Sequence, residues 1–351
     1  MDLPGNCPLL PLKRRTERPL VSRVFLLLLS ALSLGACGTS PLPSSATLPQ
    51  SITSLSTSSS PPSAKPYFSS SGARLWAEGA RLWGEGGFSL PSSSRDWRQQ
   101  VNVPETQAFE AGKGVTIALL DSGVDLTHPM LRGVLLPGHD FVDGDENPSE
   151  EGDETDLIYG HGTAVAGVLQ QMAPAARILP LRVLGTGGSG QAAHVAQAIR
   201  LAVDQGAHII NLSVAGSVSS EGVRAALQYA ANRNVLVVAA SGNNGESAPQ
   251  APADALNQKN TLGAFGLSVT AVDQSGNLPS WSNRGGEVQA PGVDILTSYP
   301  GRRLVRASGS SFAAPVVSGA LALALAQGKD AQTLAAQLST GSLLDVKVLL
   351  K

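Results

Sequence analysis

From about Trp97 onward, short aliphatic runs alternate with longer Ala-rich segments, and this alternation is the strongest constraint on the fold. Four runs predict strands: Val115 to Leu120, Ile178 to Val183, His208 to Leu212 and Val235 to Ala239. Apolar residues spaced three and four apart predict helices at Gln191 to Gln205 and Glu221 to Asn232. Strands that alternate with helices indicate βαβ units. The sequence therefore predicts an α/β fold, a mostly parallel sheet with helices on both faces, and chemistry beyond the carboxyl ends of the strands.

Charge and cysteine content exclude several classes of function. The formal net charge is −2 and 15% of residues are charged, so no broad basic surface points to nucleic acid as a partner. Cys7 and Cys37 are the two cysteines of the chain. Both precede the predicted fold, which therefore contains neither a disulfide nor a thiolate metal site.

The N-terminal region has the layout of an export signal. Basic residues from Lys13 to Arg23 precede an apolar stretch from Val24 to Ala36, which is short for a membrane-spanning helix. Residues Leu34 to Cys37 resemble the lipobox of bacterial lipoproteins, which implies cleavage after residue 36 and a lipid on Cys37. We therefore expect an extracytoplasmic protein, attached to the cell-envelope membrane through that lipid. The alternative is an ordinary signal cut near Ala36, an incidental cysteine and a secreted chain.

Two further segments separate the signal from the predicted fold. Residues 37–72 are dominated by Ser, Pro and Thr and predict a tether without a packed core. Residues 73–96 contain a tandem repeat, ARLWAEG from Ala73 and ARLWGEG from Ala80. In a helix its tryptophans, seven residues apart, would lie near one face. Two copies are too few for a solenoid, so the segment is interpreted as a small docking element, a duplication scar or the remnant of a pro-region, rather than as a binding box.

Three separated motifs supply the groups that covalent hydrolysis of an amide needs. Asp121 follows a predicted strand within DSGVD, His161 lies within GHGTAVAG, and Ser311 lies within GSSFAAP ahead of an apolar run. A serine that opens a buried helix is favoured by the helix dipole, and Pro315 is expected to lie in the first turn of that helix. An activated hydroxyl, a base and a group that orients the base are then all present.

These motifs resemble the three signatures of the subtilisin family, in that family's order of Asp, His and Ser. The segment ASGNNG from Ala240 resembles its oxyanion loop and makes Asn243 a donor to the oxyanion. The resemblance covers residues 97–351 and implies a three-layer subtilisin-like peptidase domain with Asp121, His161 and Ser311 as catalytic triad. It also implies extended or unfolded polypeptides as substrates, a monomer, and no cofactor for catalysis.

The resemblance also assigns the substrate-binding segments. It implies that one strand, Ser213, Val214, Ala215 and Gly216, pairs with the substrate backbone and that Ala240, Ser241 and Gly242 form the other wall of the specificity pocket. Ala215 stands where the family more often has Gly, Ala164 where it has His, and Phe312 where it has Met. No acidic residue occurs in the pocket segments, so we expect apolar or aromatic side chains before the cleaved bond.

Nine acidic residues crowd the segment from Asp140 to Asp156. Oxygen ligands from Asp140, Asp143, Asp145 and Asn147 predict a structural Ca²⁺ site, and some subtilisins bind calcium in this loop. A solvated acidic loop without a metal is the alternative. For the whole chain, the rival interpretation is a catalytically silent surface lipoprotein that uses the same fold to bind peptides.

Overall fold

The computed structural model describes residues 74–76, 81–85, 96–104, 111–216, 220–257 and 265–351. The predicted signal at 1–36 and tether at 37–72, with both cysteines, lie outside these residues. In the described part of the chain, no helix has the length and apolarity needed to cross a membrane.

The centre of the fold is an eight-stranded sheet in which every pair of neighbours is parallel. In spatial order its strands are β13 (Ser342–Leu343), β10 (Val288–Pro291), β9 (Gly266–Val272), β8 (Leu236–Ala240), β7 (Ile209–Leu212), β3 (Thr116–Asp121), β5 (Arg177–Arg182) and β4 (His139–Asp140). The four predicted strands correspond to β3, β5, β7 and β8, each within one residue at either end.

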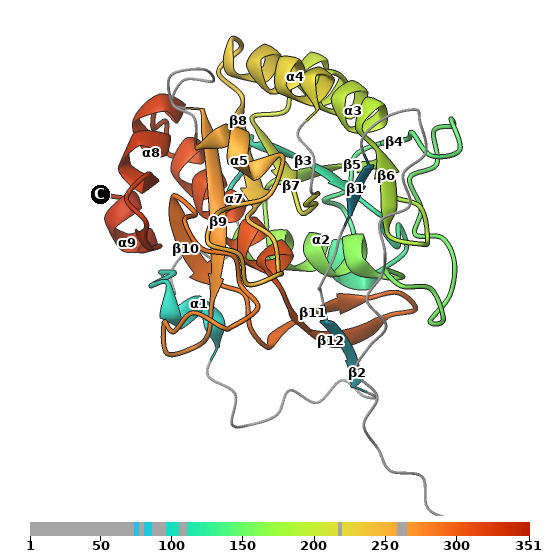
Figure 1. The fold of residues 1–351 in the computed structure, drawn as a ribbon, viewed down its shortest axis with the longest axis horizontal. Helices are drawn as coiled ribbons and strands as arrows, with labels where there is room; N and C mark the ends of the chain where they lie inside the picture. The colour runs from blue at the N-terminus through green and yellow to red at the C-terminus, as the bar shows by residue number, and fades with distance from the viewer. Residues whose placement is uncertain (1–73, 77–80, 86–95, 105–110, 217–219, 258–264) are drawn as a thin grey trace, which may run out of the picture. The chain divides into compact units, whose positions relative to one another are not determined.

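Helices cover both faces of this sheet, which confirms the predicted three-layer architecture (Figure 1). Successive side chains of β3 point to opposite faces, so Ile117 packs into one core and Ala118 into the other. The first core is covered by α1 (Trp97–Gln100), α2 (His161–Met172), α7 (Ser310–Ala326), α8 (Ala331–Leu338) and α9 (Val346–Leu349). The second is covered by α3 (Ala192–Asp204), α4 (Glu221–Ala231) and α5 (Ala253–Leu256), so the two predicted helices, α3 and α4, share one face.

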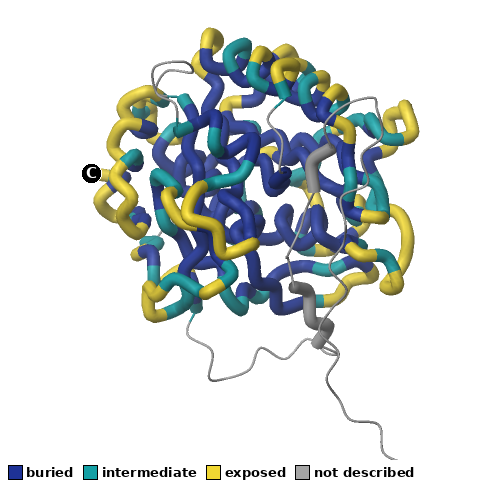
Figure 2. The backbone as a smooth tube through the Cα atoms, viewed as in Figure 1, coloured by how far each residue is buried: buried dark blue, intermediate teal, exposed yellow. Residues whose placement is uncertain are grey.

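Helix α7 is buried over most of its length in the first core, against α2 and the sheet (Figure 2). A small residue makes the contact with α2 possible. A Cβ atom added to Gly319 would lie 2.3 Å from Cβ of Met172, a distance that real side chains do not reach. The close packing of these helices brings the elements that begin with His161 and Ser310 together at one side of the sheet.

Two smaller antiparallel sheets include the tandem repeat. The first copy contributes β1 (Arg74–Trp76), which pairs with β6 (Ser189–Gln191). The second contributes β2 (Arg81–Glu85), which pairs with β12 (Arg303–Ser308), itself paired with β11 (Ile295–Tyr299). The helical arrangement considered for the repeat is wrong, because each copy completes its hydrogen bonds as a strand of a different sheet. A short 3₁₀ turn, η1 (Pro129–Leu131), completes the described elements.

Candidate active site

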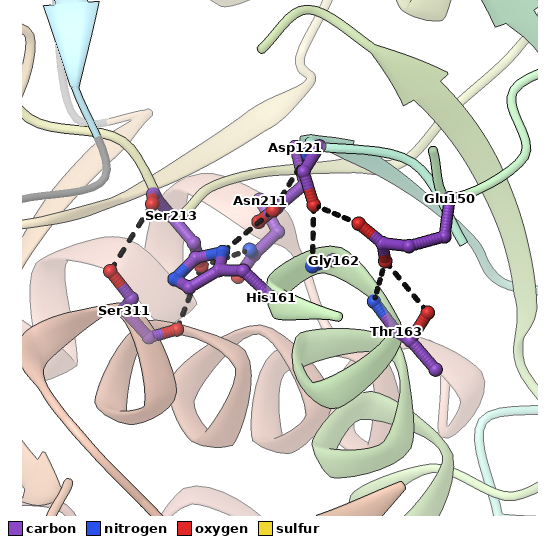
Figure 3. Close-up of polar contacts among 9 residues, drawn as sticks. Asp121, Glu150, His161, Gly162, Thr163, Asn211, Ser213 and Ser311 are labelled. Carbon is purple, nitrogen blue, oxygen red and sulfur yellow. Dashed lines mark hydrogen bonds and ion pairs between the residues drawn. The ribbon is translucent and has the colours of Figure 1, made fainter. Parts of the chain in front are cut away.

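Asp121 and His161 meet at the carboxyl edge of the sheet. Asp121 is the last residue of β3 and His161 is the first residue of α2. The His161 Nδ1 atom lies 2.6 Å from Asp121 Oδ1, and both side chains are buried (Figure 3). The Ser122 backbone N–H donates to the same Asp121 oxygen at 2.8 Å. The carboxylate is thus held from its own strand while it orients the imidazole.

Glycine permits this close approach of helix and strand. A Cβ atom added to Gly162 would lie 2.0 Å from the Gly123 carbonyl oxygen and 3.1 Å from the Asp121 side chain. Gly123 has φ of 113°, a conformation that glycine adopts at little cost. Gly123 and Gly162 are therefore required by the close contact of the two backbones.

The environment of His161 suits a general base. Burial lowers the pKa of His161, but the charge and hydrogen bond of Asp121, with a smaller contribution from Glu150, raise it above its usual value overall. Its Nε2 atom is buried and has no hydrogen-bond partner among the described residues. A raised pKa and an unengaged Nε2 leave the ring able to take up a proton from a neighbouring hydroxyl.

Ser311 is the second residue of α7, and Ser213 holds it at two points. The Ser213 hydroxyl donates to the Ser311 carbonyl oxygen at 2.8 Å, and Ser311 Oγ donates to the Ser213 carbonyl oxygen at 3.2 Å. The Ser311 hydroxyl therefore bonds to the backbone beyond β7 and has to rotate to reach His161. Catalytic hydrogen bonds are often unformed until substrate binds.

Pro315 explains why Ser213 is needed. In an α-helix the carbonyl of residue 311 accepts from the N–H of residue 315, which proline lacks. The expectation that Pro315 falls in the first turn is wrong, because α7 begins at Ser310 and Pro315 is its sixth residue. The carbonyl that Pro315 leaves without a helical partner is the one that accepts from Ser213 Oγ.

Further neutral groups support this arrangement from inside the fold. Asn211 on β7 donates from Nδ2 to Ser213 Oγ at 2.9 Å, and Ser318 Oγ donates to Asn211 Oδ1 at 2.8 Å. All of these side chains are buried. The nucleophile candidate is therefore held by a chain of hydrogen bonds that carries no ionisable group.

Asn243 lies next to the start of α7. Its Oδ1 accepts from the Ser310 N–H at 2.7 Å, which fixes the amide with Nδ2 as its donating end. The Gly242 N–H donates to Ser310 Oγ at 3.0 Å and fastens the same loop to the helix. The first N–H groups of a helix have no partner within the helix, so Ser311 supplies a second donor beside this amide. The pair fits an oxyanion site.

Comparison with known proteins agrees with this geometry. A model of the subtilase family (Peptidase_S8) matches residues 112–340. The chain belongs to this family. It is 38% identical over 257 residues to thermitase of Thermoactinomyces vulgaris, covering 70% of this chain and 87% of that protein.

Two further relatives extend the comparison. Subtilisin Savinase of Lederbergia lenta is 37% identical over 223 residues, covering 60% of this chain and 76% of the relative. A thermophilic serine proteinase of Bacillus sp. (strain AK1) is 40% identical over 233 residues, covering 63% of this chain and 54% of that longer protein. As a subtilase, the chain is a serine endopeptidase that acts on polypeptides and needs no cofactor for catalysis.

The predicted substrate segments of this subtilase border the serine. Ser213 to Gly216 are buried, and Gly216 forms an antiparallel bridge with Ala251. Ala240 ends β8, and Gly242 has φ of 105° in the turn that follows. Strands β6 and β12, which accept antiparallel strands on their edges, were not predicted from the sequence. Pairing between segments more than 100 residues apart leaves no local sequence pattern. The glycines at 188 and 190, ahead of α3, could have indicated that an exposed strand edge lies there.

Arg182 lies where the predicted calcium ligands were expected to converge. Its Nη1 lies 2.5 Å from Asp140 Oδ2 and from Asp143 Oδ2, and its Nη2 lies 2.9 Å from Glu151. Burial alone lowers the pKa of Arg182, but these carboxylates raise it, so the guanidinium stays charged.

The other two predicted ligands are engaged locally and are not part of this cluster. Asp145 Oδ1 accepts from the Asn147 N–H, and Asn147 Oδ1 accepts from Ser149 Oγ. In the described residues the acidic group of Asp140 and Asp143 is neutralised by arginine, so these side chains do not fit a calcium site without rearrangement. Calcium at the four predicted ligands stays a prediction.

Two other histidines, His128 and His208, have structural contacts away from the triad candidates. His128 is buried, and its Nδ1 accepts from the Met130 N–H at the start of η1. His208 Nδ1 accepts from the Thr116 N–H at 3.1 Å. Neither ring contacts the triad candidates, so His161 alone among these three is placed for chemistry.

Proposed function

We propose that this subtilase is an exported, lipid-anchored endopeptidase that cleaves extended polypeptides through an acyl-enzyme on Ser311. His161 takes the proton from Ser311 Oγ as that oxygen attacks the scissile carbonyl, and later returns it to the leaving amine. Asp121 holds the imidazole tautomer and stabilises its charged form. Asn243 Nδ2 and the Ser311 N–H stabilise the oxyanion. Water activated by His161 then hydrolyses the acyl-enzyme.

The contact that carries this proposal is the buried 2.6 Å pair of Asp121 Oδ1 and His161 Nδ1. A carboxylate on Nδ1 leaves Nε2 as the reactive nitrogen, and Nε2 is buried without a partner among the described atoms. A silent peptide-binding lipoprotein has no need of a carboxylate and an imidazole paired where water is excluded, and a carboxylate is costly to bury.

The preference for extended substrates is supported by the repeat. Strands β6 and β12 each take an antiparallel strand from the same chain, and the β2 pairing ends at Ser308, three residues before Ser311. Backbone added to a sheet edge is the mode by which extended peptides bind. We extend the proposal to residues 73–96, which act as a short pro-region whose strands occupy edges that a substrate would use.

Side-chain preference follows from the segments beside Ser311. Ser213 to Gly216 and Ala240 to Gly242 are buried and contain no acidic residue to pair with Lys or Arg. Apolar or aromatic residues are therefore favoured before the cleaved bond. Cleavage mapping on a peptide library tests this, and dominant cleavage after Arg or Lys contradicts it.

Export and anchoring rest on residues 1–37. Labelled fatty acid should be incorporated into the full chain in bacterial cells and should be absent from Cys37→Ser. Equal labelling of both chains contradicts the anchor, and release of unlabelled protein into the medium supports the ordinary-signal alternative. We also propose that the protein is a monomer and that residues 97–351 form its peptidase domain.

Fluorophosphonate labelling tests the catalytic assignment. The chain from Gly72 onward should be labelled on Ser311, and Ser311→Ala should lose both label and hydrolysis. Ser275→Ala, at an exposed turn away from the site, serves as the matched control. A folded chain that takes no Ser311-dependent label contradicts the peptidase proposal and favours the binding lipoprotein.

A further inference from the structure

Glu150 differs from the other acidic residues of its loop because its carboxylate binds residues that flank the triad candidates. Oε1 accepts from Ser122 Oγ at 2.6 Å. Oε2 accepts from the Thr163 N–H at 3.1 Å and from Thr163 Oγ1 at 2.8 Å (Figure 3). Three donors on one carboxylate exceed what a solvated loop residue needs. Glu150 is thus built into the fold beside the triad.

The partners of Glu150 belong to the two segments that carry Asp121 and His161. Ser122 follows Asp121 directly, donates its N–H to Asp121 Oδ1, and accepts from the Gly162 N–H at 3.0 Å. Thr163 lies two residues after His161 on α2. One carboxylate therefore bridges the end of β3 and the first turn of α2.

A second link closes the same bridge from the other side. Thr163 Oγ1, which donates to Glu150, accepts from the Asp125 N–H at 2.8 Å. The turn after β3 is thus tied to α2 through Ser122 and again through Asp125. Both ties pass through side chains that Glu150 orients, so its removal loosens the approach of His161 to Asp121.

Opposing influences set the pKa of Glu150. Burial raises the pKa of Glu150 to about 7, with a further rise from the charge of Asp121, against hydrogen bonds from Ser122 and Thr163 that lower it. The titratable groups that interact with it are Asp121 on β3, His161 on α2, Tyr159 before α2 and Tyr299 on β11. When ionised, Glu150 raises the pKa of His161.

We propose that Glu150 is a positioning residue of the peptidase, which fixes the geometry of Asp121 and His161 through Ser122 and Thr163 and adds its charge to their pair. This inference rests on the proposed catalytic roles of that pair. Glu150 touches neither substrate nor the reacting atoms. Its effect is expected on kcat and on the pH profile, with little change in KM.

The test compares Glu150→Ala, Glu150→Gln and Glu150→Asp in the full chain, with rates divided by active sites counted with a fluorophosphonate. Glu150→Ala should lower kcat per site about tenfold to a hundredfold, the range for a lost hydrogen-bonded charge. Glu150→Gln, which keeps the shape, should retain kcat within about threefold. Its acid limb of kcat/KM should move to lower pH by about half a unit, because the charge that raises the pKa of His161 is gone.

The control is Glu146→Gln, which removes a charge from an exposed residue of the same loop and should leave both readouts unchanged. Glu150→Asp keeps the charge, so its acid limb should stay near that of the wild type. A kcat per site and an acid limb unchanged in Glu150→Ala and Glu150→Gln overturn the inference. If Glu150→Ala does not fold, the limb of Glu150→Gln decides. Wild-type hydrolysis measured in the same series tests the peptidase proposal separately.

Discussion

The two halves of the site are built from different kinds of interaction. The serine side consists of Ser311, Ser213, Asn211 and Ser318, joined by neutral hydrogen bonds of 2.8 to 3.2 Å. The histidine side consists of His161, Asp121 and Glu150, three ionisable groups whose charges act on one another. A neutral network holds its geometry at any pH, whereas a charged one changes with protonation. The nucleophile candidate is therefore placed by neutral hydrogen bonds, whereas the pKa of the base is set by neighbouring charges.

The largest expected effect is on kcat, from a substitution of Asp121 on the histidine side. Asp121→Asn keeps the shape of the side chain but favours the wrong tautomer of His161, and should lower kcat by about 10⁴. The pKa of His161 should fall, because burial lowers it and the opposing charge of Asp121 is gone. The acid limb of kcat/KM should therefore move to lower pH in the residual activity. A stopped-flow or long-time assay over pH 4 to 9 measures both changes, and a limb that stays in place contradicts the electrostatic account.

The same variant has a stability consequence of definite sign. A histidine whose folded pKa is raised adds stability below its unfolded value of about 6.5, and loses that contribution as pH rises through the folded pKa. Asp121→Asn should therefore lose more stability at acid pH than at alkaline pH. Urea unfolding at the two ends of the range checks this sign.

A smaller effect tests the serine side through Ser213 and Pro315. Ser213→Ala leaves the buried Ser311 carbonyl without its donor and should destabilise the fold by about 1 to 3 kcal/mol. Pro315→Ala restores the N–H that a helix offers to that carbonyl, so Ser213→Ala should cost less in this background by about 1 kcal/mol. The four chains should be compared in a Ser311→Ala background, which prevents self-digestion. Additive changes in unfolding free energy would show that Ser213 does not substitute for the missing helical donor.

The central residues of both halves were predicted from the sequence. Asp121, His161, Ser311 and Asn243 stand in short motifs, because each needs particular neighbours within a few residues: glycines for backbone contact, or a helix start. The sheet was predictable for a similar reason, since each buried strand is a local apolar run.

Features that depend on distant contacts were not predictable. Glu150 is one of nine acidic residues in its segment, and Ser122 and Thr163, which single it out, lie 28 and 13 residues away. Arg182 binds acidic residues about 40 positions distant, which no local sequence pattern indicated. The two copies of the repeat have nearly the same sequence, but each pairs with a strand of a different sheet.

Calcium is expected to have only a minor effect on Tm. Its predicted ligands lie in the acidic segment that precedes His161. Arg182 already balances Asp140 and Asp143, and an added ion would have to displace a buried guanidinium. Calcium or chelator should therefore change Tm by less than about 2 °C, which is below 1 kcal/mol for a domain of this size. A calcium-dependent rise of several degrees, lost in Asp145→Asn, would instead support the four predicted ligands.

The smallest effect concerns Phe312, where the two halves meet. Its ring centroid lies 5.3 Å from that of His161, at the position where the resemblance to the subtilisin family led us to expect methionine. A thioether there is oxidised to a polar sulfoxide, whereas a phenyl ring is not attacked under mild conditions. Wild-type activity should thus survive dilute peroxide, and Phe312→Met, otherwise active, should lose activity on the same treatment. Met130 and Met172 are present in both chains, so a loss in the wild type as fast as in Phe312→Met would assign the damage to them and remove Phe312 from the account.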